Sequence, residues 1–251
     1  MEDVDTTREI RGAGNAILST LAAFGMQSDE AVVRQSTRTD RYAHALDRLR
    51  ARDLAYPCRC SRSQLAAFGG VHPGQCVAPA GDDDQTPAWR VRVGEARVAF
   101  EDLICGRISQ DIGREVGDFV VRRADGLFAY QLAVVVDDAD QDIGEVVRGV
   151  DLLDSTPRQI LLQRLLELPT PGYLHLPLAL DEQGRKLSKH DGARPVDAAD
   201  PLPALRAALA FLGQDIPRSA EVASFLGEAA AAFAPDRIPR SPLAHAAMRK
   251  D

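Results

Sequence analysis

Apolar and polar residues follow helical spacing in some stretches of the chain and alternate in others, mainly over its first two thirds. Thr6 or Thr7 can cap a helix that ends near Phe24-Gly25, and a second helix is predicted from about 40 to 54, with arginines facing outward. The apolar side of the first helix would consist of Ile10, Ala13, Ile17, Leu18 and Leu21. Alternation predicts strands at 89–93, 96–100 and 119–123.

The type of one segment in the second half is left open by the pattern. Tyr130–Asp138 is rich in valine, which favours a strand, but a run of this length is equally compatible with a buried helix. Glu145–Gly149 is typical of a buried strand, and it ends beside a charged residue, Arg148, where open α/β sheets place ligand-binding groups. Ser155-Thr156-Pro157 predicts a helix start, because proline is favoured at the first helical position.

The last fifty residues form an alanine- and leucine-rich tail. From about Pro201 onward the pattern predicts helices that are interrupted at Gly213 and Pro217. The alanine-rich stretch 229–233 is compatible with a helix docked on the core and also with an isolated helix that frays.

Composition describes a soluble globular chain of 251 residues, with 45% hydrophobic residues and a formal net charge of −7. This charge argues against a surface coated in basic residues for nonspecific nucleic-acid binding, although it is compatible with a local basic groove. No segment reaches the roughly 18 uncharged apolar residues that cross a bilayer. The acidic start, Met1 to Asp5, lacks the features of a secretory signal, and we expect a cytoplasmic protein.

Three cysteines and a histidine have the spacing of a metal site. Cys58, Cys60, His72 and Cys76 form Cys-x-Cys, a loop of eleven residues and His-x-x-x-Cys. Thiolates and imidazole are what tetrahedral zinc prefers, and four protein ligands leave no position for a reacting water, so we predict one structural zinc per chain. The alternative is a set of unrelated thiols and a surface histidine, and Cys105 is interpreted as a core residue.

A short basic loop, Lys186-Leu187-Ser188-Lys189-His190, follows the apolar run 174–180. Two cations three residues apart can bind a polyphosphate and stabilise the charge that develops as its bonds rearrange. A solvated turn is the alternative, because five-residue basic motifs often arise by chance.

Four motifs in order resemble a known family. They are the runs 126–138, 146–152 and 155–159 and the lysine loop, and together they resemble the catalytic half of glutamyl-tRNA synthetases, most closely the shortened relatives called glutamyl-Q tRNA(Asp) synthetases. The resemblance covers nearly all of residues 1 to about 213. It implies an α/β fold, the Rossmann-like catalytic domain of class I aminoacyl-tRNA synthetases, in which 130–138 is a helix. The implied parts are a partial catalytic domain (1–57), a zinc-bearing, acceptor-stem-like insertion (58–117), the second catalytic half with the lysine loop (118–200) and a helical tail (201–251).

The resemblance also implies roles for single residues. Lys186 and Lys189 match the KMSKS signature, and Lys189 would contact ATP, which acts with Mg²⁺, and stabilise its α-phosphate during glutamate attack. Arg148 would bind a carboxylate of glutamate, Tyr130 would hydrogen-bond the same amino acid, and Glu2 would pair with its ammonium group. From the residues alone, the alternatives are an ordinary ion-pair partner, a core aromatic and a surface acid, respectively.

The function implied by the resemblance is ATP-dependent activation of L-glutamate and its transfer to queuosine in the anticodon of tRNA(Asp). The alternatives are a fragment of an ordinary glutamyl-tRNA synthetase and a noncatalytic zinc module that binds tRNA or a protein. The chain stops about sixty residues after the lysine loop, so we expect that it does not read an anticodon through the long helical region of full glutamyl-tRNA synthetases.

Two departures from the family stand out. The HIGH signature, which normally precedes the acidic segment at Glu2, has no counterpart in these residues. We expect a misplaced start rather than a degenerate enzyme, because the lysine loop and the metal ligands are retained, and we expect this polypeptide as written to activate glutamate weakly or not at all. The second departure is His72, where the shortened family often has tyrosine; histidine should preserve or strengthen zinc binding.

Overall fold

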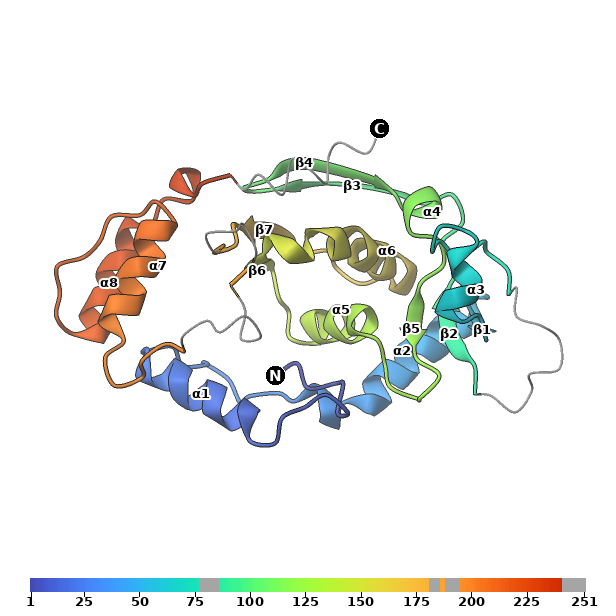
Figure 1. The fold of residues 1–251 in the computed structure, drawn as a ribbon, viewed down its shortest axis with the longest axis horizontal. Coiled ribbons are helices and arrows are strands. Elements are labelled where there is room, and N and C mark those ends of the chain that lie inside the picture. The colour runs from blue at the N-terminus through green and yellow to red at the C-terminus, as the bar shows by residue number, and fades with distance from the viewer. Residues whose placement is uncertain (77–85, 181–185, 188–194, 241–251) are drawn as a thin grey trace.

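The computed structural model describes residues 1–76, 86–180, 186–187 and 195–240, and its helices and strands interleave along the chain (Figure 1). The α-helices are α1 (Ala13–Ala23), α2 (Thr39–Ala51), α3 (Arg62–Ala66), α4 (Ile112–Glu115), α5 (Tyr130–Asp140), α6 (Thr156–Leu166), α7 (Leu202–Phe211) and α8 (Val222–Ala232). The strands are β1 (Ala55–Cys58), β2 (Ala88–Val91), β3 (Arg97–Asp102), β4 (Gly106–Asp111), β5 (Val120–Arg122), β6 (Glu145–Gly149) and β7 (Gly172–Leu176). The 3-10 helices among the described residues are η1 (Gln35–Thr37), η2 (Val150–Ser155) and η4 (Pro235–Arg237).

The described strands form two sheets. One has the order β1-β2-β5 and is antiparallel, and the other has the order β4-β3-β7-β6, with β7 parallel to both β3 and β6. The register places Arg148 beside His175 and Asp102 beside Tyr173. Parallel strands joined through helices confirm the predicted α/β fold. The segment 58–117 contributes strands to both sheets, and its boundaries as an insertion stay a prediction.

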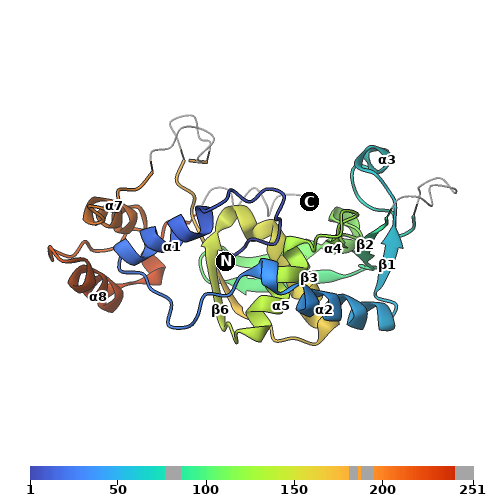
Figure 2. The same ribbon diagram turned by 90° about the horizontal axis from the view of Figure 1, so that it is seen from below.

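The main core lies where α2, α5 and α6 pack against the two sheets (Figures 1 and 2). Six consecutive residues of α5, Leu132 to Asp137, are buried. A helix that is buried on every side has no amphipathic period, which is why the sequence pattern alone could not separate a helix from a strand here. The structure confirms the helix that the family resemblance implied.

The N-terminal helix begins later than predicted. Thr6 and Thr7 lie in a turn, where the Thr7 hydroxyl donates to Asp5 Oδ1 (2.7 Å), and α1 starts only after Gly12, whose φ of 86° ends any continuous helix. Ile10, predicted to belong to the apolar side of this helix, lies before its start and is 76% exposed. Ile17 and Leu21 are likewise exposed among the described residues.

Strand β6 is an edge strand, which corrects the prediction that Glu145–Gly149 is buried. The order β4-β3-β7-β6 gives β6 one hydrogen-bonded neighbour in the described structure, and Val147 on its outer face is 57% exposed. The continuous apolar appearance of the segment therefore does not reflect burial on both faces.

The C-terminal tail forms α7 and α8, which end and begin around the predicted interruptions at Gly213 and Pro217. Phe24 from the end of α1 packs with Leu205 of α7 and the fully buried Phe225 of α8. These three helices lie together at one end of the molecule (Figure 2). The tail is therefore docked, which settles the choice between a docked and an isolated helix.

The N-terminus is held in place by hydrogen bonds. The Met1 ammonium donates to Val33 O (2.6 Å), and the Asp3 carboxylate accepts from the backbone N–H (2.9 Å) and the hydroxyl (2.8 Å) of Ser36. These contacts fix Glu2 between two anchored residues, so this acid is not on a frayed end.

A buried carboxylate joins this N-terminal region to α5. Asp137 accepts hydrogen bonds from Gln35 Nε2 (2.9 Å), Arg38 Nε (2.6 Å) and the Tyr42 hydroxyl (2.8 Å). Burial, with the Asp137 charge, raises the pKa of Tyr42, so its hydroxyl remains a donor. The partners lie about a hundred residues from Asp137 in sequence, and no local pattern predicts them.

Candidate functional site

Arg148 lies one residue before the end of β6, at the carboxyl ends of two parallel strands, where α/β sheets bind ligands. Its guanidinium donates to four side chains, none of which is a carboxylate. The acceptors are His175 Nε2 (3.2 Å from Nε), the Tyr130 hydroxyl (3.4 Å from Nη1), Thr156 Oγ1 and Gln159 Oε1 (each 2.7 Å from Nη2). Arg148 makes no ion pair with the described residues. Its charge is oriented but not neutralised by contact, an arrangement suited to binding a carboxylate.

Two further donors lie beside this guanidinium. Gln159 is 2% exposed, and its Nε2 has no hydrogen-bond partner in the part of the chain that the structure describes. A buried amide donor without a partner is costly, so a ligand acceptor here would be favourable. Burial, followed by the charge of Glu2, raises the pKa of Tyr130 although Arg148 and Gln159 oppose this, so its hydroxyl stays protonated at neutral pH.

Two carboxylates share the electrostatic environment of Arg148. Burial raises the pKa of Asp138 to about 6, with Asp137 and Glu2 adding to the effect and Arg148 opposing it. Burial also raises the pKa of Glu2, against the terminal ammonium and Arg148. With both acids ionised, their charges exceed that of the single guanidinium. A ligand that carries a cationic group as well as a carboxylate would complement these acids with the first and Arg148 with the second.

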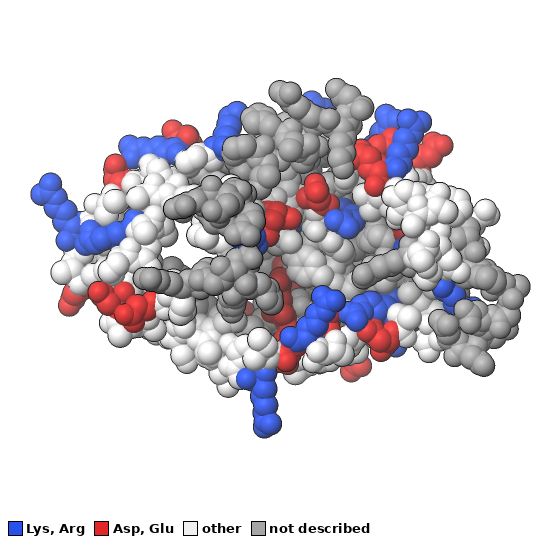
Figure 3. All heavy atoms as spheres, in the orientation of Figure 1, with Lys and Arg blue, Asp and Glu red and all other residues white. Residues whose placement is uncertain are grey.

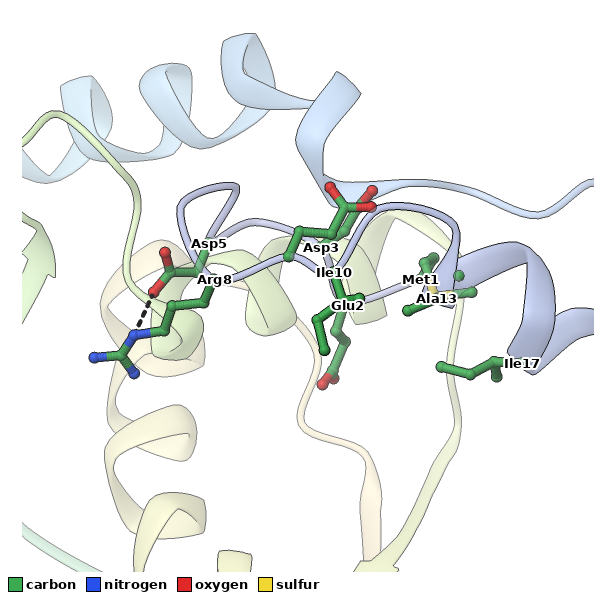
Figure 4. A pocket seen from close by; sticks show the side chains of 10 residues that line it. Met1, Glu2, Asp3, Asp5, Arg8, Ile10, Ala13 and Ile17 are labelled. Carbon is green, nitrogen blue, oxygen red and sulfur yellow. Dashed lines mark ion pairs between the residues drawn. The ribbon is translucent and has the colours of Figure 1, made fainter. Parts of the chain in front are cut away.

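A surface cavity of about 300 Å³ opens beside Glu2 (Figure 4). Asp5 and Arg8, joined by an ion pair of 3.6 Å, lie on one side of it, and Ala13 and Ile17 of α1 lie on the other. The remaining lining residues are Met1, Asp3, Glu9, Ile10 and Gly14. Of the predicted site residues, Glu2 lines this cavity, whereas Arg148 and Tyr130 do not.

The first lysine of the basic loop lies close to the end of β6. Lys186 Nζ forms an ion pair of 2.5 Å with Asp151 Oδ2, three residues after Arg148, and the Leu187 N–H donates to Ala179 O (2.9 Å). Lys189 lies outside the described residues. The prediction that Lys189 shares one cavity with Arg148 and Tyr130 therefore remains a prediction, while Tyr130 and Arg148 do meet.

Charged side chains of both signs are interspersed over the described part of the face in Figure 3. They do not gather into one continuous basic field there, in keeping with the net charge of −7. None of the described helices is long and apolar enough to cross a membrane.

The three predicted cysteine ligands come together. The sulfur atoms of Cys58, Cys60 and Cys76 all lie within 4.8 Å of one another, and the Cys60 and Cys76 sulfurs are 3.7 Å apart. Zinc–sulfur bonds of about 2.3 Å in a tetrahedron put sulfurs about 3.8 Å apart, so this donor set fits zinc. His72 Nε2 is 3.2 Å from Cys58 Sγ, but the histidine is not part of the three-residue group.

A buried chain of hydrogen bonds connects His72 to Tyr56 and Asp118. The histidine Nδ1 is 3.1 Å from the Tyr56 hydroxyl, which donates to Asp118 Oδ2 (2.6 Å). Burial raises the pKa of the Cys58 thiol to about 11, so without a metal this thiol is protonated at neutral pH. Metal binding there must release a proton.

The side chains that the sequence reasoning missed surround those that it found. Asp138 and Gln159 each lie within a run that carries the family resemblance, and that position was the available signal. Thr156 lies in the same run as Gln159, whereas His175, which also contacts Arg148, lies in an apolar strand whose local pattern indicates packing only.

Comparisons with known proteins agree with this geometry. The family model described as "tRNA synthetases class I (E and Q), catalytic domain" matches residues 1–70 and 77–223. The glutamyl-Q tRNA(Asp) synthetase of Xanthomonas oryzae pv. oryzae is 53% identical over 244 residues, which cover 96% of this chain and 80% of that protein. The enzyme of the same name from Ectopseudomonas mendocina is 50% identical over 253 residues, covering 99% of this chain and 86% of the relative.

One solved structure shares the fold over almost the whole chain. A glutamate tRNA ligase from Elizabethkingia meningosepticum, in complex with its amino acid, superimposes with a TM-score of 0.76 at 24% identity. The match covers 98% of this chain and 60% of that chain, so the protein spans less than two thirds of this structural neighbour. At this identity the likeness concerns the fold alone.

Proposed function

Because this chain belongs to the class I aminoacyl-tRNA synthetases that act with glutamate and glutamine, we propose that it is a ligase that uses ATP to activate L-glutamate and transfers it to queuosine in the anticodon of tRNA(Asp). The names of relatives about 50% identical over nearly the full chain support the tRNA substrate. The observation that carries the amino-acid site is the oriented guanidinium of Arg148, with two carboxylates nearby.

Each group of a glutamate molecule has a counterpart among these side chains. Arg148, the Tyr130 hydroxyl and the free Gln159 amide offer donors to a carboxylate, and Glu2 and Asp138 offer negative charge to the ammonium group. Lys186 and Lys189 would contact the phosphates of ATP, which would bring Mg²⁺. The reaction would take place in the cytoplasm, where tRNA and ATP are present.

Glutamate-dependent exchange of pyrophosphate into ATP, together with calorimetric glutamate binding, tests the amino-acid site. Arg148→Lys should weaken glutamate binding by about 10- to 100-fold, because lysine cannot reproduce the fork of donors. Arg164→Lys, an exposed change on α6, is the matched control and should bind like the unchanged chain. Equal binding by Arg148→Lys, or a preference for glutamine over glutamate, would contradict the proposal.

Transfer to three RNAs tests the acceptor. We expect labelled glutamate to be attached to tRNA(Asp) that carries queuosine, and not to tRNA(Asp) without it or to tRNA(Glu). Charging of tRNA(Glu) would instead support an ordinary glutamyl-tRNA synthetase activity. Binding of tRNA without any transfer would support the noncatalytic alternative.

We also propose that Cys58, Cys60, Cys76 and His72 hold one structural zinc. The spacing of the sulfurs supports this, and bound zinc would link β1 to the residues around His72 and Cys76. Metal analysis in reducing buffer should find about one zinc per chain, and Cys58→Ser or Cys76→Ser should release it. Cys105→Ser, which changes a buried thiol elsewhere, is the control and should keep its zinc. A metal-free protein would remove the proposal.

A further inference from the structure

A buried carboxylate and imidazole lie directly behind Arg148. Asp102 ends β3 and His175 belongs to β7, and both side chains are completely buried, with 2.6 Å between Asp102 Oδ2 and His175 Nδ1. The other carboxylate oxygen accepts from the backbone N–H groups of Ile104 (3.0 Å) and Cys105 (2.8 Å). The turn between β3 and β4 therefore fixes the carboxylate, and the carboxylate fixes the ring.

The charge state of this carboxyl follows from its hydrogen bonds. Burial alone would raise the pKa of Asp102, but the hydrogen bonds from His175 and from the N–H groups of Cys105 and Ile104 outweigh burial and lower it. At neutral pH Asp102 is ionised and can only accept hydrogen bonds. The proton of the 2.6 Å hydrogen bond thus belongs to His175 Nδ1.

The opposite side of the imidazole leads to the same tautomer. His175 Nε2 lies 3.2 Å from Arg148 Nε and 3.1 Å from Thr156 Oγ1. An arginine Nε always carries a hydrogen, so Nε2 must present its lone pair. The Thr156 hydroxyl can donate or accept and is compatible with either tautomer, so Asp102 and Arg148 decide: the ring is neutral and protonated at Nδ1, with its Nε2 lone pair toward the guanidinium.

The consequence is that Arg148 is oriented by contacts within the protein, before any ligand binds. A free arginine side chain has many rotamers, and ordering it on substrate binding costs entropy. The Nε contact to His175, with the two acceptors on Nη2, fixes the plane of the guanidinium before a ligand arrives. The ring of Tyr173, 5.6 Å from Arg148 Cζ and stacked on His175, limits the guanidinium from one face.

We propose that Asp102 and His175 are positioning residues that hold the Arg148 guanidinium, through the Nδ1-protonated tautomer of His175, in the orientation that binds the substrate carboxylate. The proposal rests on the proposed function for its ligand, glutamate. It gives a role in the amino-acid site to Asp102, which lies in the segment 58–117 that the family resemblance implies is an insertion.

Asp102→Asn reverses the polarity of the relay at almost constant shape. The amide oxygen must serve the backbone N–H groups of Ile104, Cys105 and His175, so the NH₂ group faces the ring and favours the tautomer with hydrogen on Nε2. That hydrogen then points at the Arg148 Nε–H. We expect the KM for glutamate in pyrophosphate exchange and the Kd for glutamate to rise by about 10- to 100-fold, with the KM for ATP unchanged.

Two substitutions at His175 distinguish a role of its hydrogen bonds from a role of its packing alone. In His175→Gln the amide can donate toward Asp102 and accept from Arg148, whereas His175→Met has no comparable acceptor. Glutamate affinity should therefore stay within several-fold of the unchanged chain in His175→Gln and fall by about 10- to 100-fold in His175→Met. A role limited to packing would not favour glutamine over methionine, and thermal unfolding of both variants checks that they fold.

Nitrogen-15 spectra of the imidazole in the full chain report the tautomer without any activity. We expect the ring hydrogen of His175 on Nδ1 in the unchanged chain and on Nε2 in the Asp102→Asn variant. Hydrogen on Nε2 in the unchanged chain overturns the proposal, and so does unaltered glutamate affinity in a folded Asp102→Asn. If that variant does not fold, the unchanged spectrum and the glutamine–methionine pair still decide. An unchanged chain that binds no glutamate would instead remove the proposed function, while the spectrum still tests the relay.

Discussion

Replacing Asp138 by asparagine should stabilise the protein, and more so as the pH rises. The Asp138 carboxylate has no hydrogen bond with the described residues and lies partly buried near Arg148, Glu2 and Asp137, with Tyr173 also close to it. Burial raises its pKa from an ordinary 3.8 to about 6. The folded state therefore holds the proton more tightly than the unfolded state, and ionisation opposes folding.

The sign and size follow from that pKa. Below about pH 4 the carboxyl is neutral in both states and costs nothing. As the pH rises through 6, the cost grows to a limit of about 3 kcal/mol, of which we expect about 1–3 kcal/mol because solvent screens a partly exposed group. Asp138→Asn removes this cost, so roughly half of the gain should be present at pH 5 and nearly all of it at pH 7 to 8.

Urea unfolding of both proteins at pH 5, 6, 7 and 8 measures this difference in free energy. Asp29→Asn removes an exposed carboxylate and is the control, with an expected change within about 0.5 kcal/mol that does not vary with pH. A destabilised Asp138→Asn at pH 8, or a gain that does not depend on pH, would refute the reasoning. The first outcome would mean that Arg148 compensates the buried charge, and the second that the gain does not come from ionisation. Under the proposed function the same variant should bind glutamate more weakly, a trade of stability for binding.

Two further predictions concern packing. Phe225→Ala should lower the free energy of unfolding by about 3–5 kcal/mol, because its fully buried ring joins α8 to α1 and α7. Phe233→Ala, at a position that is 39% exposed, is the control and should cost about 1 kcal/mol or less. Equal urea midpoints for the two variants would contradict this prediction. Gly117→Ala should lower the free energy of unfolding by about 1–3 kcal/mol, because φ is +65° and the new Cβ would lie 2.6 Å from His72 O. Gly144→Ala is the control, because a Cβ there would have no neighbour within 4 Å. Equal thermal unfolding temperatures for the two variants would refute this account.

Local features of this protein were determined by the sequence itself. The helix that begins beside Pro157 and the breaks at Gly213 and Pro217 depend on residues only a few positions apart, and the structure confirms them. The spacing of Cys58 and Cys60 likewise pointed to a cluster of sulfurs, which the structure brings together with Cys76. Ordered motifs, read through the family resemblance, singled out Tyr130 and Arg148, which meet.

Only the tertiary structure decided features that depend on distant partners. Helix α5 has a sequence that also suits a strand, and it is a helix where α2, α6 and the sheets surround it. The edge position of β6, and hence the exposure of Val147, follows from strand order, which no local pattern encodes. In the sequence, His175 is one more residue of an apolar strand. In the structure, Asp102, 73 positions away, and Arg148 lie on either side of its ring. A side chain's charge, tautomer and orientation are set by what lies opposite it, and in this fold those neighbours come from other parts of the chain.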